Sequence, residues 1–217
     1  MKQTSDICRS AFRPTCRPEG RPTSRTWIIK TVIFLLCLIP LARLVWLGFH
    51  DGLGANPIEF ITRSTGAWTL NFLLITLCVT PLRKLLNRPA LLRYRRMLGL
   101  FAFFYAVLHF MTYLWLDQFF DWQAILKDIA KRPFITLGFS AFVLLIPLAV
   151  TSPKAMLKRL GRHWQTLHRA IYLIAILGVF HYLWLVKKDM TMPLIYMAIL
   201  GILLLARVVR SKPVISR

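Results

Sequence analysis

Three histidines lie inside or at the ends of apolar segments of this chain: His109, His168 and His181. Each of these segments is long enough to cross a lipid bilayer. An ionisable side chain within a bilayer is unfavourable, so it marks a candidate functional site. Neutral imidazole is also a usual axial ligand of haem iron. Histidines on separate membrane helices, in a chain without a catalytic domain of its own, therefore suggest a membrane cytochrome b.

A membrane histidine also has a structural interpretation, as a donor of a hydrogen bond between helices. For a lone histidine this is the commoner role, but two histidines at matched depth on parallel helices favour ligation. Both interpretations stay open for His168, which lies close to the membrane boundary. His163 falls in a basic connection, where a solvated role is expected. His50 falls in the loop after the first apolar segment and suits a structural or headgroup-contact role.

The composition sets the fold class. Of 217 residues, 57% are hydrophobic, which is too apolar for a soluble domain of this size. Apolar runs near the ~20 residues needed to span hydrocarbon indicate helices. We therefore predict an all-α integral membrane protein, a six-transmembrane-helix bundle over residues 27–210, preceded by a basic and disordered cytoplasmic tail at residues 1–26. The six predicted spans are 27–47, 66–82, 98–116, 134–151, 166–186 and 192–209.

The distribution of charge predicts the orientation. The net charge is +21, and basic connections alternate with nearly neutral ones along the chain. This positive-inside pattern places both termini in the cytoplasm. It also explains the charge without nucleic-acid binding, for which no recognisable motif is present. The four cysteines form no C-x-x-C pair, so the sequence supports neither an iron–sulfur nor a zinc site.

Depth in the membrane decides which histidines can share an iron. At ~1.5 Å per residue, His109 lies roughly 12 Å and His181 roughly 9 Å below the outer boundary. We predict that one haem takes an axial bond from each. His168 lies about 20 Å from His181 along the helix, and about 140° away around it if the helix is ideal. His168 is therefore predicted to serve a second cofactor or an incomplete inner site.

Several segments bring a known family into view. The chain resembles, over about residues 30 to 210, the haem-binding membrane subunit of the bacterial protein-methionine-sulfoxide reductase system, within the ferric-reductase-like transmembrane superfamily. The stretches that carry the resemblance are His109, Leu160-Gly161-Arg162-His163-Trp164-Gln165-Thr166-Leu167-His168-Arg169-Ala170-Ile171-Tyr172-Leu173, His181-Tyr182-Leu183-Trp184 and residues 52–57, 95–100 and 132–138. Together these motifs are specific, although each is weak by itself.

The resemblance implies a haem b, an FMN and a multi-pass location in a bacterial inner membrane. It implies electron delivery to a periplasmic molybdopterin-containing catalytic subunit, which reduces methionine sulfoxide in oxidised periplasmic proteins. Quinone or a cytosolic flavin reductase would be the donor. The family's histidines carry over to His109, His168 and His181, as cofactor-binding residues and iron ligands. In this interpretation the chain transfers electrons and performs no catalysis of its own.

Two other functions stay open from the sequence. One is a stand-alone transmembrane ferric or metal reductase that needs no protein partner. The other is a non-redox transporter whose histidines line a proton or substrate path. Transporters of this size often contain inverted repeats and broken helices. No internal repeat is evident in the sequence.

Overall fold

The computed structural model describes residues 24–186 and 189–209, and every regular element in them is helical. The predicted tail lies outside these residues except for its last three, which begin helix α1 (Ser24–Phe49). The chain divides into two compact units, Met1–Leu36 and Cys37–Arg217. The described part of the first unit is the first half of α1, and the second unit contains the rest of α1 and every later helix that the structure describes.

Helices of three kinds make up this second unit. Long apolar helices cross it, short helices lie in the connections, and a π-helical turn extends one long helix. In chain order after α1 they are α2 (Pro57–Leu85), η1 (Pro89–Leu91), α3 (Leu92–Met111), η2 (Thr112–Asp117), α4 (Trp122–Lys131), α5 (Pro133–Val150), α6 (Lys154–Leu160), α7 (Arg162–His168), α8 (Ala170–Leu185) and α9 (Thr191–Val209).

Five helical segments of the described residues are long and apolar enough to cross a membrane. They are Trp27–Phe49, Pro57–Leu85, Pro89–Asp117, Pro133–Val150 and Arg162–Leu185. The sixth predicted span corresponds to a shorter apolar helix, Thr191–Arg207. The chain is therefore an all-α, multi-pass membrane protein.

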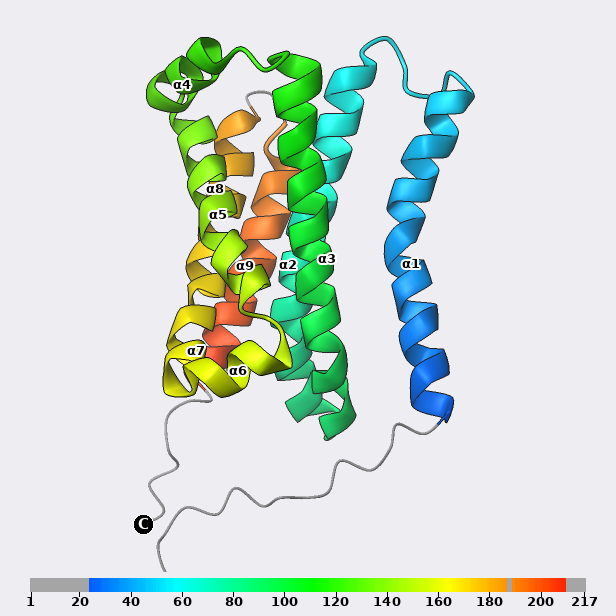
Figure 1. Cartoon of the computed structure of the whole chain (residues 1–217), viewed down its shortest axis with the longest axis vertical. Coiled ribbons are helices and arrows are strands. Elements are labelled where there is room, and N and C mark those ends of the chain that lie inside the picture. Colours follow the sequence, from blue (N-terminus) through cyan, green and yellow to red (C-terminus); the bar gives the residue numbers. More distant parts are fainter. Residues whose placement is uncertain (1–23, 187–188, 210–217) are drawn as a thin grey trace, which may run out of the picture. The chain divides into compact units, whose positions relative to one another are not determined.

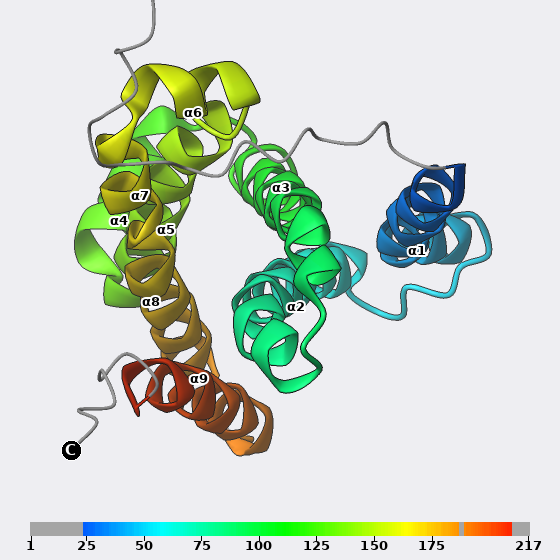
Figure 2. The same cartoon turned by 90° about the horizontal axis from the view of Figure 1, so that it is seen from below.

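Four of these helices form the centre of the bundle. α2 packs along α3, α3 along α5, α5 along α8, and α8 along α2, while α9 covers α2 and α8 (Figure 2). α2 and α5 start at the end where α4 lies, at the top of Figure 1, and α3 and α8 return to it. We call this the α4 end, and the opposite end, where α6 and α7 lie, the α6 end.

The second span starts nine residues earlier than predicted. The Asn56 side chain accepts a hydrogen bond from the Glu59 amide (3.3 Å) and Pro57 occupies the first turn, so both residues favour a helix start here. Glu59 also pairs with Arg63 (2.6 Å) one turn on. These polar residues interrupt the apolar run, and for that reason the prediction of a loop over 48–65 is wrong from Pro57 onwards.

Two connections predicted as loops are also helical. At the α4 end, Asp121 caps α4 by accepting from the amides of Gln123 and Ala124. α4 buries Ile125 and exposes Leu126, as an amphipathic helix does at a membrane surface. At the opposite end, α6 and α7 occupy the basic connection, separated by Gly161 at a φ of 52°. Hydropathy finds spans and misses such short helices.

The fifth predicted span has one irregular residue, Arg169, within the continuous helical segment Arg162–Leu185. α7 ends at His168 and α8 begins at Ala170, and the Arg169 amide between them bonds to the carbonyls of both Gln165 and Thr166. The angle of about 140° between His168 and His181 assumes an ideal helix, and because Arg169 has helical φ and ψ of −69° and −22° it applies only approximately.

Tyr105 organises the packing of α3. It is fully buried and its ring stacks on Phe72 of α2, with centroids 5.2 Å apart. Its hydroxyl donates to the Cys37 carbonyl (2.8 Å) and accepts from the Leu41 amide (3.2 Å). Those two backbone groups would bond each other in an uninterrupted helix. The hydroxyl therefore inserts into the ladder of α1, next to Pro40.

Candidate functional site

The structure brings His109 and His181 together. His109 extends from α3 and His181 from α8, and their ring centroids lie 6.2 Å apart with the planes inclined at 72°. The prediction that these two residues lie at one level is therefore confirmed as geometry. Whether they bind an iron stays a prediction.

Each of these imidazoles is fastened to a neighbouring helix. Nδ1 of His109 donates to the Thr62 carbonyl of α2 (2.9 Å), and Nδ1 of His181 donates to the Phe134 carbonyl of α5 (2.6 Å). A carbonyl oxygen only accepts, so the proton sits on Nδ1 and Nε2 keeps its lone pair. This is how metal-binding histidines are usually oriented. The structural role expected of a membrane histidine and a ligand role are thus compatible here.

The spacing of the rings fits an iron between them. A metal–imidazole bond is about 2 Å long and the ring centroid lies about 1 Å behind the nitrogen, so two opposed ligands have centroids about 6 Å apart. Among the described residues no group of three or more His, Cys, Asp or Glu side chains could hold a metal ion. A pair of imidazoles at this distance is a donor set that suits a haem iron.

Residues at the α4 end of α3 support this pair. The Thr112 hydroxyl donates to the His109 carbonyl (2.7 Å), and the Thr62 hydroxyl donates to that of Thr112 (3.3 Å). Thr112 begins the π-helical turn η2, a feature often found beside functional sites. The sequence analysis missed the partners Thr62 and Phe134 because they act through backbone carbonyls, which leave no side-chain signature.

His168 is held in another way. Its Nδ1 donates to the carbonyl of Trp164, four residues earlier in the same helix (3.1 Å), and its ring stacks on the Trp164 indole at 3.9 Å. The indole nitrogen donates in turn to the Thr151 carbonyl (2.9 Å). His168 is half-buried in α7 at the α6 end (Figure 1). The structure does not bring it to the pair formed by His109 and His181.

The two remaining histidines match their structural interpretation. His50 is exposed, stacks on Trp46 with centroids 4.0 Å apart, and bonds to the Trp46 carbonyl (2.9 Å). His163 is exposed in α7. Neither is placed near another histidine by these contacts. Cys37 and Cys78, the two cysteines within the described residues, are free thiols.

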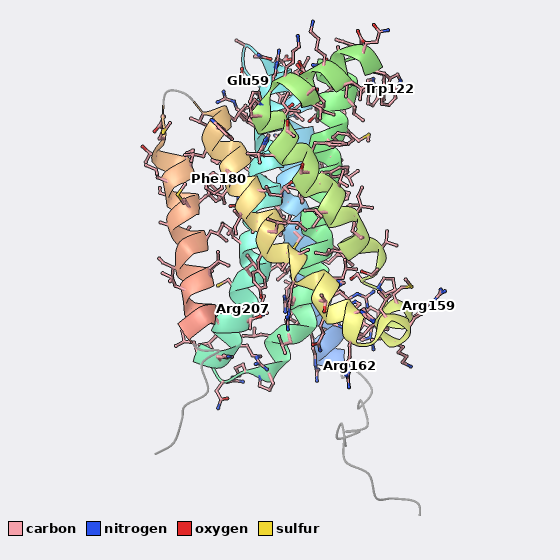
Figure 3. The ribbon with its side chains drawn as sticks, turned by 90° about the vertical axis from the view of Figure 1, so that its left-hand side faces the viewer. Glu59, Trp122, Arg159, Arg162, Phe180 and Arg207 are labelled. Atoms are coloured by element: carbon pink, nitrogen blue, oxygen red, sulfur yellow. The ribbon has the colours of Figure 1, made fainter. Side chains whose placement is uncertain are left out.

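Charge separates the two ends of the bundle. Figure 3 shows Glu59 and Trp122 at one end, and Arg159, Arg162 and Arg207 at the other. Every acidic residue of the described part lies in or beside a connection at the α4 end: Asp51, Glu59, Asp117, Asp121, Asp128 and Asp189. The connections at the α6 end contain arginine and lysine without any carboxylate.

Comparison with known proteins supports a redox family. Residues 64–179 match the sequence profile described as ferric reductase like transmembrane component. This range contains His109 and His168 and ends two residues before His181.

Curated relatives extend the match over most of the chain. A protein of Herminiimonas arsenicoxydans is 59% identical over 83% of this chain and 84% of its own length. One of Azospira oryzae is 57% identical over 90% and 83%, and one of Bordetella pertussis 52% identical over 88% and 90%. All three are named protein-methionine-sulfoxide reductase heme-binding subunit MsrQ. This chain therefore belongs to the MsrQ family of haem-binding membrane subunits of methionine-sulfoxide reductase.

Proposed function

We propose that this chain is a haem b electron-transfer subunit in which His109 and His181 provide the two axial ligands. The observation that carries the proposal is the 6.2 Å separation of the two rings, each with Nδ1 bonded to a carbonyl and Nε2 available for a metal. The names of the relatives support the haem.

The same geometry supports electron transfer rather than catalysis. When bound, the haem supplies a one-electron carrier within the bilayer. If both imidazoles held the iron, the chain would offer a substrate no open position on it, whereas catalytic metal sites keep one open. The chain's own residues would hold the group rigidly, because each imidazole is fixed by a carbonyl of a second helix. The chain then needs a partner to perform the chemistry.

For the topology we propose six spans, with α9 as the sixth, and both termini in the cytoplasm of a bacterial inner membrane. The α6 end, which is basic and without described carboxylates, would face the cytoplasm. The histidine pair would then lie toward the periplasm. Residues 27–210 would form the membrane domain and residues 1–26 a cytoplasmic tail.

For the partners we propose a periplasmic molybdopterin-containing subunit that reduces methionine sulfoxide in oxidised proteins. Electrons would enter at the α6 end, from quinone or from a cytosolic flavin reductase, with FMN as an intermediate carrier. Guanidinium and ammonium groups at this end suit an anionic flavin phosphate or an acidic donor protein. The relatives' names, which describe one subunit of a reductase, support a catalytic partner.

The decisive experiment is an oxidation assay that depends on the partner. The chain is purified in detergent with its haem, reduced, and mixed with the catalytic subunit and a protein containing methionine sulfoxide. Oxidation of the haem should require both additions. A purified chain without a haem spectrum would contradict the proposal and favour a non-redox transporter.

A second candidate is a stand-alone metal reductase, which the ferric-reductase-like profile favours. The same assay separates the two functions. A reduced haem that is oxidised rapidly by ferric chelate, and not by the catalytic subunit with its substrate, would support the metal reductase.

A further inference from the structure

Two glycines lie directly against the paired imidazoles. A Cβ atom at Gly66 of α2 would lie 3.0 Å from Cε1 and 3.1 Å from Nδ1 of His109. A Cβ atom at Gly138 of α5 would lie 2.8 Å from Nδ1 and 2.9 Å from Cε1 of His181. Any side chain at these positions would therefore displace a ring.

Among the glycines of the described helices, only Gly66 and Gly138 are this close to another residue, and in both cases that residue is a histidine. At Gly99 of α3 the nearest atom to a Cβ would be the Thr76 methyl, at 3.7 Å. At Gly178 of α8 it would be a Leu70 methyl at 3.5 Å, an ordinary contact. Gly201 of α9 has no such neighbour within 4 Å.

The glycines also uncover the carbonyls that hold the rings. Thr62 precedes Gly66 by four residues, and Phe134 precedes Gly138 by four. A Cα–Cβ bond in a helix tilts toward the N-terminus, over the turn where this carbonyl lies. A glycine leaves that side of the carbonyl open, so the imidazole can approach and donate its Nδ1 proton.

The same arrangement occurs twice in the chain. The hydrogen bonds join residues 47 positions apart in both cases. The second set lies 72 positions after the first: Phe134 corresponds to Thr62, Gly138 to Gly66 and His181 to His109. In each copy a helix that starts at the α4 end packs along one that returns to it, α2 with α3 and α5 with α8. The residue spacings at the two imidazoles are therefore identical, although the residues around them differ.

We propose that Gly66 and Gly138 are positioning residues that hold the imidazoles of His109 and His181 at a steep mutual angle and so set the ligand field of the iron. The proposal rests on the proposed function, because it concerns the haem that these histidines would bind. Each ring is therefore held by one glycine and by the carbonyl four residues before it, Gly66 with Thr62 and Gly138 with Phe134. We call each such glycine–carbonyl pair a seat.

The angle makes a spectroscopic prediction for the unmodified protein. In a ferric low-spin haem, steeply inclined axial imidazole planes bring two iron d orbitals close in energy and produce a large maximal g value. Parallel planes produce a smaller one. With the rings at 72°, the haem-loaded chain in detergent should show the large value in its electron paramagnetic resonance spectrum. A signal typical of parallel planes would overturn the proposal without any variant.

Alanine substitutions test the seats directly. G66A and G138A should lower the affinity for haem by about 10-fold or more, as loss of a metal-bound histidine's supporting contacts does. Haem that remains should show a shifted maximal g value and a shifted midpoint potential. G138A should have the larger effect, because the Cβ contact there is closer. The matched controls are G99A and G178A, on the helices that carry the two histidines.

The controls also exclude a general effect on the helices. Alanine is favoured over glycine within a helix, so G99A and G178A should keep haem content, g values and potential. If G66A and G138A behave like these controls, the positioning role is wrong. If G138A does not accumulate as folded protein, the positioning role is tested by G66A, where the Cβ contact is less close, and by the g value of the wild-type haem.

The outcomes distinguish this proposal from the proposed function. If His109→Ala and His181→Ala both keep the wild-type haem spectrum, the ligand pair itself is wrong. If those variants lose the haem while both glycine variants match the controls, only the seats are wrong.

Discussion

The histidines at the two ends of the bundle are held in different ways. At the α4 end, His109 and His181 each donate to a carbonyl of a neighbouring helix, so their positions depend on how α2, α3, α5 and α8 pack. At the α6 end, His168 donates to the Trp164 carbonyl of its own helix and stacks on the Trp164 indole, which in turn donates to the Thr151 carbonyl at the end of α5. His109 and His181 therefore bond directly to neighbouring helices, whereas His168 is also connected to α5 through Trp164. The direct bonds of the first two rings fix the distance between them.

The largest effect should follow from removing a ligand of the pair. His109→Ala and His181→Ala should each lose most of the haem and the six-coordinate, low-spin spectrum, an effect larger than the about 10- to 100-fold loss caused by removing an outer-shell partner. Haem content per purified protein and the visible spectrum measure this. Wild-type haem content and a low-spin spectrum in both single variants would show that the two rings are not the ligands.

A smaller and different effect is expected for His168→Ala. This variant should keep the low-spin spectrum of the outer haem, because His168 takes no part in that pair, but reduction from the α6 end should slow several-fold or an inner cofactor should be lost. Stopped-flow reduction by a cytosolic flavin reductase measures the rate. Expression and thermal stability must match the wild type before the rate is interpreted. Selective loss of the outer haem from a folded variant would contradict the separation of the two sites.

Substituting Trp164, which stacks on His168, should have a weaker effect than substituting His168 itself. Trp164→Leu removes the stacked indole and its hydrogen bond to the Thr151 carbonyl, a bond worth about 0.5–1.5 kcal/mol in proteins. The variant should lower the thermal stability slightly and reproduce part of the His168→Ala defect in reduction. Trp46→Leu is a suitable control, because Trp46 stacks on His50 in the same way at the other end. If both substitutions slow reduction equally, the role given to the α6 end is wrong.

The smallest expected effect concerns salt. If the arginines and lysines at the α6 end steer an anionic donor, reduction by a flavin reductase should slow as the ionic strength rises, because exposed charges are screened over about 8 Å at 0.15 M. If these residues only set the topology, the rate should be independent of salt. Electron transfer to the proposed periplasmic partner serves as the internal comparison, since the α4 end contains both acidic and basic residues.

The fold was largely predictable because membrane spans depend on local composition. Apolar runs predicted α5 to within one residue at each end, at 134–151 against Pro133–Val150. The start of α2 and the helix α4 were missed, since capping by Asn56 and by Asp121 lies outside what hydropathy measures. The irregularity at Arg169 coincides with a backbone amide shared between two carbonyls, which no pattern of side chains predicted.

The candidate site also has features that the sequence predicts and features that only the tertiary structure shows. The depth of His109 and of His181 follows from counting residues along helices, because the rise per residue is nearly constant. By itself the sequence thus determined that the chain is a multi-span helical protein, which histidines belong to one level, and to which family it is related. Only the tertiary structure decided that the two rings lie 6.2 Å apart at 72°, and that Gly66 and Gly138 hold them against carbonyls of other helices. The reason is physical: a backbone carbonyl and a missing side chain acquire a role only when another helix packs against them.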